Sequence, residues 1–251
     1  MEAGNAAAAG VKAVFPDAEI VVRPLADGGE GTVEALTTGM GGRMETALVS
    51  DPLGRKISAS YGILEENKTA VIEMAAAAGL PLLSKEERNP LHTTTYGVGE
   101  LIRDAIRKGC RHFIVGIGGS ATNDGGVGML SALGFEFLDK SGQPVRNGAA
   151  GLADLAEIRS GHVLPVLKEC TFRVACDVEN SLCGELGCSC VFGPQKGATP
   201  AMVAELDAAL TNYAAVIKAQ LGVDLANTPG AGAAGGLGAG MLAFTQAKMQ
   251  S

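Results

Sequence analysis

The sequence has no tryptophan, and aromatic residues make up only 4% of its 251 positions. A core must therefore be built from Ala, Val, Leu, Ile and Met, and a hydrophobic fraction of 47% suffices for one. No apolar run reaches the length of a membrane-spanning helix, and residues 1–4 lack the basic and apolar regions of a secretory signal. We therefore expect a cytoplasmic protein that has no membrane partner.

Two further absences exclude classes of function. The net charge is −7 and no long basic run occurs, which argues against nucleic acid as a partner. No G-x-x-x-x-G-K-[ST] loop is present, so a kinase with this sequence would not be a P-loop enzyme. Of six cysteines, Cys183, Cys188 and Cys190 lie close together. They form no paired C-x-x-C pattern and no histidine is near, so free thiols are favoured over a metal site.

Glycine is abundant, and the most informative segment is glycine-rich: residues 116–126 read GIGGSATNDGG. It follows the apolar run 112–117 and precedes an apolar helical pattern at 127–133, so it predicts a strand, a loop and a helix. Such a loop turns backbone N–H groups toward an anion. Ser120, Thr122 and Asn123 add polar donors, and Gly118 and Gly119 allow close approach. Asp124 adds a carboxylate, which suits a divalent metal that bridges it to a phosphate.

Two more glycine-rich turns precede helical patterns, at residues 26–32 and 229–238. Three such turns in one chain favour a cleft that binds phosphate, and Asp27, Gly28 and Gly29 of the first turn would face it. The alternative is that the glycines only allow tight turns and close packing. That alternative is favoured for the glycines at 235, 236 and 238, which lie inside a helical pattern.

Asp177 and Lys196 are the remaining candidates. Asp177 ends the predicted strand 172–176, and a carboxylate at the carboxyl end of a strand projects into the crevice where open α/β sheets bind ligands. There it would accept a proton or hold Mg²⁺; a turn or helix-cap carboxylate is the alternative. Lys196 lies in a stiff Gly-Pro-Gln-Lys-Gly turn, where it would pair with a phosphate or a carboxylate, or else be a solvated loop lysine.

The remaining patterns indicate an α/β protein with strands at 19–22, 44–49, 56–63 and 69–74, the last three forming a β-meander. Residues 135–138 are expected to form a hairpin with 144–145. Helices are predicted at 2–15, at 32–38, after the threonines 93–95, from Thr199–Pro200 onward, and from the last glycine-rich turn to about residue 248.

Taken together, the motifs resemble the type-1 glycerate kinase family. The matching segments, in order and spacing, are residues 26–32, 51–54, 72–77, 116–126, 175–178, 192–198 and 229–236. The resemblance implies two α/β domains, one with a parallel sheet and one inserted mixed domain. Residues 1–43 would be an N-terminal piece of the first domain, 44–228 the inserted domain, and 229–251 a returning helix of the first. The family's opening strand with its lysine-bearing loop, and its C-terminal portion, would lie outside this chain.

The resemblance also implies a phosphotransferase that uses ATP and Mg²⁺ to phosphorylate D-glycerate, at the 2-hydroxyl. Within the matching motifs, Asp124 and Asp177 are our candidates for the catalytic and metal-binding roles. Nucleotide or substrate contacts are expected from Asp27, Gly28, Gly29, Gly118, Gly119, Ser120, Thr122, Asn123 and Lys196.

Other hypotheses stay open at this point. One is a non-catalytic remnant that binds an anion. Another is a nicotinamide dehydrogenase, because Gly116, Gly118 and Ala121 follow a strand and Asp139 lies about 20 residues further on. Asp124 and the glycines after it count against that fingerprint. Whether the chain forms a homo-oligomer is left open as well.

Overall fold

The computed structural model describes residues 2–22 and 31–250. Within these ranges the α-helices are α1 (Glu2–Val14), α2 (Thr32–Gly39), α3 (Ala75–Ala78), α4 (Tyr96–Arg107), α5 (Val127–Ala132), α6 (Cys188–Phe192), α7 (Pro200–Leu221) and α8 (Ala233–Thr245). The strands are β1 (Arg43–Ser50), β2 (Lys56–Leu64), β3 (Thr69–Glu73), β4 (His112–Gly116), β5 (Glu136–Asp139), β6 (Leu155–Arg159), β7 (Thr171–Ala175) and β8 (Lys248–Gln250).

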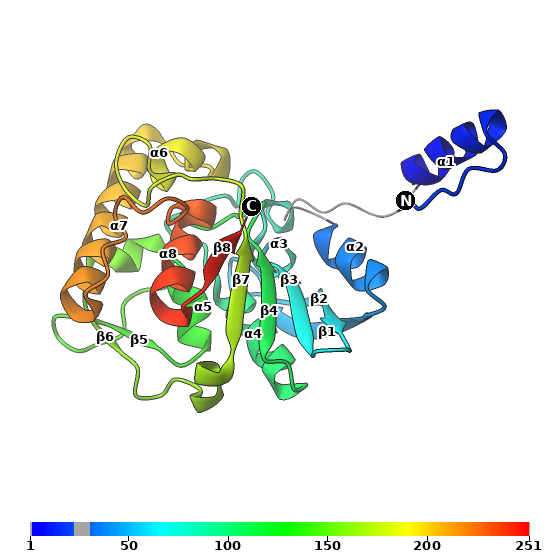
Figure 1. The fold of residues 1–251 in the computed structure, drawn as a ribbon. Coiled ribbons are helices and arrows are strands. Elements are labelled where there is room, and N and C mark those ends of the chain that lie inside the picture. The colour runs from blue at the N-terminus through cyan, green and yellow to red at the C-terminus, as the bar shows by residue number, and fades with distance from the viewer. Residues whose placement is uncertain (1, 23–30, 251) are drawn as a thin grey trace.

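A six-stranded mixed sheet in the order β1-β2-β3-β4-β7-β8 forms the centre of the fold (Figure 1). β1, β2 and β3 are antiparallel, which confirms the predicted meander. β3, β4, β7 and β8 are parallel, so their carboxyl ends meet at one edge of the sheet. The α/β class predicted from the sequence is confirmed.

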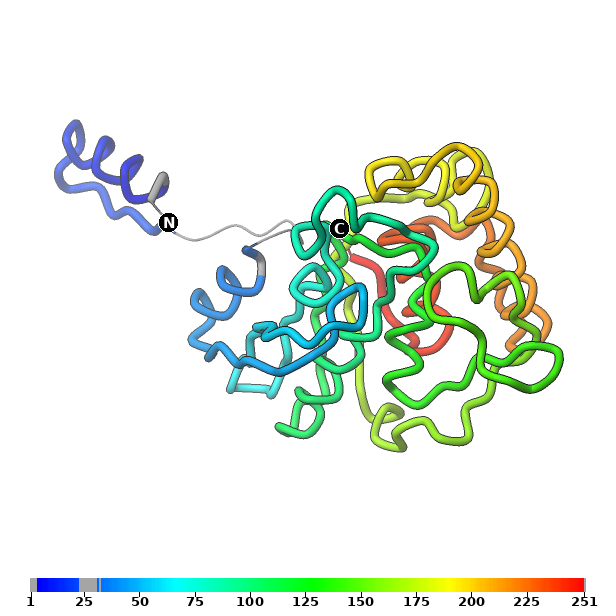
Figure 2. Tube along the Cα trace, turned by 180° about the vertical axis from the view of Figure 1, so that it is seen from behind, coloured from blue at the N-terminus to red at the C-terminus, as the bar shows by residue number. Residues whose placement is uncertain are grey.

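The two faces of the sheet are covered by different helices. Alternate residues such as Ile72, Val115 and Val174 point into the main core, beneath α4, α5, α7 and α8. On the opposite face, Val33 of α2 packs with Leu64 and Val71. In Figure 1, α2 lies on one side of the sheet and α5, α7 and α8 on the other, and Figure 2 shows the molecule from behind. With no tryptophan available, Phe113 and Phe172 stack between β4 and β7 with ring centroids 4.7 Å apart.

One predicted strand is wrong, and one predicted hairpin is only part of the pairing observed. Residues 19–22 form no strand, and no described strand lies beside them to complete their backbone hydrogen bonds. The predicted hairpin of 135–138 with 144–145 does form: Leu138 bridges Pro144, the Val145 N–H donates to the Phe137 carbonyl and the Asp139 N–H donates to the Gln143 carbonyl. The sequence did not predict that β5 also pairs with β6 on its other side.

The long helix α7 forms as its sequence predicts. The Thr199 hydroxyl oxygen accepts a bond from the Met202 N–H, and Pro200 occupies the first turn. Leu206, Leu210 and Tyr213 on its inner face are buried. None of the helices in the described ranges is both long and apolar enough to cross a membrane.

The C-terminal segment joins the same sheet as the strands before it. β8 pairs with β7, and α8 packs against α5, α6 and β7. The separate domain assignment of residues 229–251, like the boundary at residue 44, stays a prediction.

Candidate functional site

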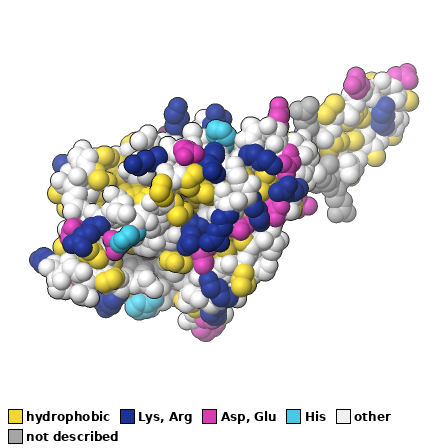
Figure 3. Space-filling model, turned by 90° about the horizontal axis from the view of Figure 1, so that it is seen from below, with side chains coloured by type: hydrophobic (Ala, Val, Ile, Leu, Met, Phe, Trp, Pro, Cys, Tyr) yellow, Lys and Arg dark blue, Asp and Glu magenta, His cyan; other side chains and the backbone are white. Residues whose placement is uncertain are grey.

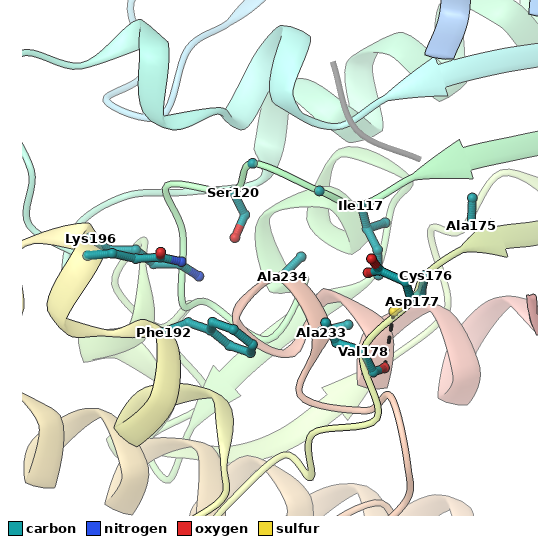
Figure 4. A pocket seen from close by; sticks show the side chains of 13 residues that line it. Ile117, Ser120, Ala175, Cys176, Asp177, Val178, Phe192, Lys196, Ala233 and Ala234 are labelled. Atoms are coloured by element: carbon teal, nitrogen blue, oxygen red, sulfur yellow. Dashed lines mark hydrogen bonds between the residues drawn. The ribbon is translucent and has the colours of Figure 1, made fainter. Parts of the chain in front are cut away.

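A cavity of about 210 Å³ lies where the parallel strands β4 and β7 end (Figure 4). Four segments form its walls: the loop after β4, the residues after β7, the turn around Lys196 and the start of α8. The lining residues are Ile117, Gly118, Gly119, Ser120, Ala175, Cys176, Asp177, Val178, Phe192, Gln195, Lys196, Ala233 and Ala234. This is the carboxyl edge of the sheet, where open α/β sheets bind their ligands.

The loop after β4 presents unused backbone donors to this cavity. The Leu80 N–H donates to the Gly119 carbonyl at 2.9 Å, and the Ala121 N–H donates to the Ala78 carbonyl at 2.9 Å. These two bonds fix the loop against the segment after β3. In the described part of the chain, the N–H groups of Gly118 and Gly119 donate to no protein acceptor. Both glycines are exposed, so their amides are available to an anion.

Lys196 supplies a buried cation at one end of the cavity. Its residue surface is only 1% exposed, and its Nζ donates to the Thr122 carbonyl oxygen at 2.6 Å. An ammonium group carries three N–H donors, so this bond leaves capacity for a ligand. Burial lowers the pKa of Lys196 to about 8, although the negative charge of Asp124 opposes the shift. The alternative of a solvated loop lysine is therefore wrong.

A short helical turn, Pro194–Lys196, holds this lysine in place. It ends at Gly197, whose φ of 92° is in the left-handed region. A side chain at Gly197 would also overlap the Arg88 carbonyl oxygen. Glycine is therefore required there both by the backbone conformation and by the lack of space.

Asp177 lies across the cavity from Lys196 and carries the opposite charge. It comes after Cys176, which follows β7, and Figure 4 shows its carboxylate beside Ile117. The residue is exposed, and no donor in residues 2–22 or 31–250 bonds to its carboxylate. The next described α-helix starts only at Cys188, so Asp177 is not a helix cap. A free carboxylate at this edge can accept a proton or bind a cation.

In contrast, the carboxylate oxygens of Asp124 accept hydrogen bonds from other residues of the chain. It is 1% exposed and does not line the cavity. Its Oδ2 accepts from the Thr95 N–H at 2.8 Å, the Thr95 hydroxyl at 2.9 Å and the Gly128 N–H at 3.1 Å. Its Oδ1 accepts from the Gly126 N–H at 3.1 Å. Burial raises the pKa of Asp124, and these bonds oppose the rise. Such a geometry does not favour the predicted roles in metal binding and catalysis.

Thr122 and Asn123 lie beneath the cavity and do not line it. Both are fully buried. The Thr122 carbonyl binds Lys196, and the Asn123 amide donates to the Ser189 hydroxyl at 3.0 Å. Their direct contact with a ligand stays a prediction. Asp27, Gly28 and Gly29 lie outside the described residues.

The apolar wall of the cavity, which includes Phe192 and Ala234, was not predicted from the sequence. Apolar side chains at a cavity wall are of the same residue types as those of the core, so they gave no signal. Glu73 ends β3 beside Gly116 of β4, a position like that of Asp177, but its Oε1 accepts the Val33 N–H of α2 at 2.9 Å and it does not line the cavity.

The donor set fits Mg²⁺ only in part. No group of three His, Cys, Asp or Glu side chains in the described chain could enclose a metal ion. Mg²⁺ is commonly held by one or two carboxylates together with substrate phosphates, and Asp177 alone satisfies that requirement. Burial raises the pKa of Cys188 to about 12, which keeps its thiol protonated and unsuited to metal binding.

The opposite edge of the sheet bears paired charges. Figure 3 shows Lys and Arg side chains gathered there among Asp and Glu. Arg43 pairs with Glu45 and Glu65, and Lys108 pairs with Glu45. The charged side chains named here are therefore paired with one another, whereas the Asp177 carboxylate at the cavity has no ion-pair partner in the described chain.

The dinucleotide fingerprint does not have its required geometry. In a dehydrogenase the helix begins directly after the glycines, so that its N-terminus meets the pyrophosphate. Here α5 starts only at Val127, and its six residues begin beyond Gly126. The nicotinamide hypothesis has no support from this arrangement.

The sequence profile described as the glycerate kinase family matches residues 1–251. The chain is 49% identical over 251 residues to "Glycerate kinase" of Haemophilus influenzae and 51% identical over 250 residues to "Glycerate 2-kinase" of Escherichia coli K12. It covers 66% of the length of each, so it spans slightly less than two thirds of these relatives, which cover 100% of it.

A crystal structure from Salmonella typhimurium LT2, assigned to glycerate kinase 2, superposes with a TM-score of 0.92 at 49% identity. The match covers 96% of this chain and 64% of that one. None of these comparisons supports a dehydrogenase or a non-catalytic anion-binding protein. The similarity extends over the whole chain and includes the fold around the cavity, and the chain belongs to the glycerate kinase family.

Proposed function

We propose that this chain acts in an ATP-dependent kinase reaction that phosphorylates D-glycerate, and that the cavity binds the acid. The observation that carries the proposal is the buried ammonium of Lys196 facing the free carboxylate of Asp177 across a cavity of about 210 Å³. Pockets for drug-sized ligands enclose about 300–1,000 Å³, so this one suits a small acid. The names of the relatives support glycerate, and "Glycerate 2-kinase" supports the 2-hydroxyl as the acceptor.

In this proposal, Lys196 and the amides of Gly118 and Gly119 hold the carboxylate of glycerate. The hydroxyl oxygen forms a bond to the γ-phosphorus of ATP, the bond between that phosphorus and the bridging oxygen breaks, and ADP leaves. Asp177 accepts the proton of the hydroxyl. Phosphoryl transfer relies mostly on positioning and charge neutralisation, which this arrangement of side chains supplies.

Asp177 is also the described residue that would hold Mg²⁺. When bound, Mg²⁺ neutralises the charge of the phosphates. Asp27, Gly28 and Gly29 would contact the nucleotide or the substrate. A cytoplasmic location accords with the use of ATP and with six free cysteines.

The test is an assay of the purified, folded chain with ATP, Mg²⁺ and D-glycerate. Formation of ADP is expected, and ³¹P NMR should identify 2-phosphoglycerate as the product. Asp177→Asn should lose turnover. Asp154→Asn, an exposed aspartate outside the cavity, is the matched control and should keep it. A folded chain that forms no phosphoglycerate would contradict the proposal.

A further inference from the structure

Three consecutive residues at the start of α8 adopt left-handed backbone conformations. Their φ and ψ angles are 54° and 40° for Ala234, 67° and 36° for Gly235, and 87° and 3° for Gly236. Glycine adopts this region freely, whereas an L-residue with a side chain disfavours it. Ala234 is therefore the one strained residue of the turn.

The surroundings hold this turn in its conformation. The Gly125 N–H donates to the Gly235 carbonyl at 3.0 Å, and the Gly236 N–H donates to the Gly232 carbonyl at 3.3 Å. A Cβ at Gly235 would overlap the Thr122 carbonyl oxygen. The turn is thus packed against the loop after β4, and Ala234 cannot relax into a right-handed conformation.

The methyl group of Ala234 projects into the cavity. Its neighbours Ala233 and Gly235 are buried, whereas Ala234 is half-buried and lines the cavity wall. In the view of Figure 4, this methyl group lies between Ser120 and Asp177. It therefore occupies space between the loop that presents backbone donors and the carboxylate that faces the acceptor hydroxyl.

We propose that the Ala234 methyl group determines specificity, by limiting the space for the substituent on C2 of a hydroxy acid that is bound between Ser120 and Asp177. This inference rests on the proposed function of the cavity. The backbone at this position suits glycine, and alanine differs from glycine only by the methyl group that fills the cavity. The substrate class is then a three-carbon hydroxy acid, and acids longer by one carbon are excluded sterically.

Ala234→Gly tests this inference without a risk to folding, because it relieves the strain. The melting temperature should rise by about 2–4 °C. The ratio of the dissociation constant of D-glycerate to that of D-erythronate, which is longer by one CHOH group, should rise about tenfold. Both constants are measured by isothermal titration calorimetry on the folded chain.

Gln246→Gly is the matched control. Gln246 has the same φ of 54°, lies at the other end of α8, is exposed and does not line the cavity. It should show a similar rise in melting temperature with no change in the ratio.

The outcomes separate the inference from the proposed function. Wild-type protein that binds neither acid contradicts the proposed function, and the inference with it. Wild-type protein that binds glycerate, while Ala234→Gly leaves the ratio unchanged or shifts it by no more than Gln246→Gly, overturns the inference alone.

Discussion

Replacement of Lys196 with methionine should alter both ligand binding and the pH dependence of stability. Methionine is a flexible apolar side chain of similar length, so it can fill the space of the lysine stem. What it removes is the buried ammonium and its bond to the Thr122 carbonyl. The two effects have different signatures and can be measured separately.

The effect on stability follows from the pKa of about 8, compared with the ordinary value of 10.5. Below pH 8 the native protein keeps the proton on a buried group, which is unfavourable by about 3 kcal/mol. Between pH 8 and 10.5 the unfolded chain binds more protons than the native protein, so the free energy of unfolding rises with pH. For Lys196 the rise from pH 7 to pH 10 is about 2.5 kcal/mol. Lys196→Met lacks this contribution.

Urea denaturation of both proteins at pH 7, 8, 9 and 10 gives the required free energies. The free energy of unfolding of Lys196→Met minus that of wild type should fall by about 2.5 kcal/mol over this range. Lys140→Met, at an exposed turn position, should show no such trend. A constant difference for Lys196→Met would refute the assignment of a buried, titrating amine. In the same variant, loss of a buried charge partner should weaken glycerate binding at pH 7 at least about 30-fold.

Three further substitutions test other parts of the account. Asp177→Asn should lower kcat by about 10²–10⁴-fold and change the dissociation constant of glycerate little, as measured by steady-state kinetics and calorimetry; equal loss in binding would contradict a role in proton transfer. Asp124→Ala leaves the buried donors of Thr95, Gly126 and Gly128 without an acceptor. Urea denaturation should therefore show a free energy of unfolding that is lower by about 3–5 kcal/mol. An unchanged free energy would show that the carboxylate does not stabilise the fold. Gly235→Ala should be destabilising by more than about 2 kcal/mol, because its methyl group would overlap the Thr122 carbonyl. Gly142→Ala, which has a positive φ but open space, should change stability by only about 1 kcal/mol.

The sheet and the edge that carries the cavity could be predicted from local patterns. Alternating and continuous apolar runs located β1, β2, β3, β4 and β7, and residues at strand ends pointed to Asp177. Strand partners were harder to predict, because pairing joins segments that are apart in the chain. The pairing of β5 with β6 was not predicted for this reason. Residues 19–22 have the residue types of a strand, but no described strand lies beside them.

The roles of buried polar residues depend on contacts that a sequence does not show. Asp124 has the residue type of a metal ligand, yet its oxygens bind Thr95, 29 positions earlier in the chain. Lys196 is buried only because its turn packs near Thr122, 74 positions away. The glycines at 235 and 236 were predicted to serve packing, and their contacts with Thr122 and Gly125 agree with that interpretation.

The central claim is that the cavity at the ends of β4 and β7 binds glycerate through Lys196 and the amides after β4. Titration of the ¹⁵N-labelled protein with D-glycerate, followed by NMR, tests this claim most directly. The account predicts that the amide signals of Gly118 and Gly119 shift with one saturation curve, and that Lys196→Met abolishes these shifts. Saturable shifts confined to other parts of the chain, with Gly118 and Gly119 unchanged, would contradict it.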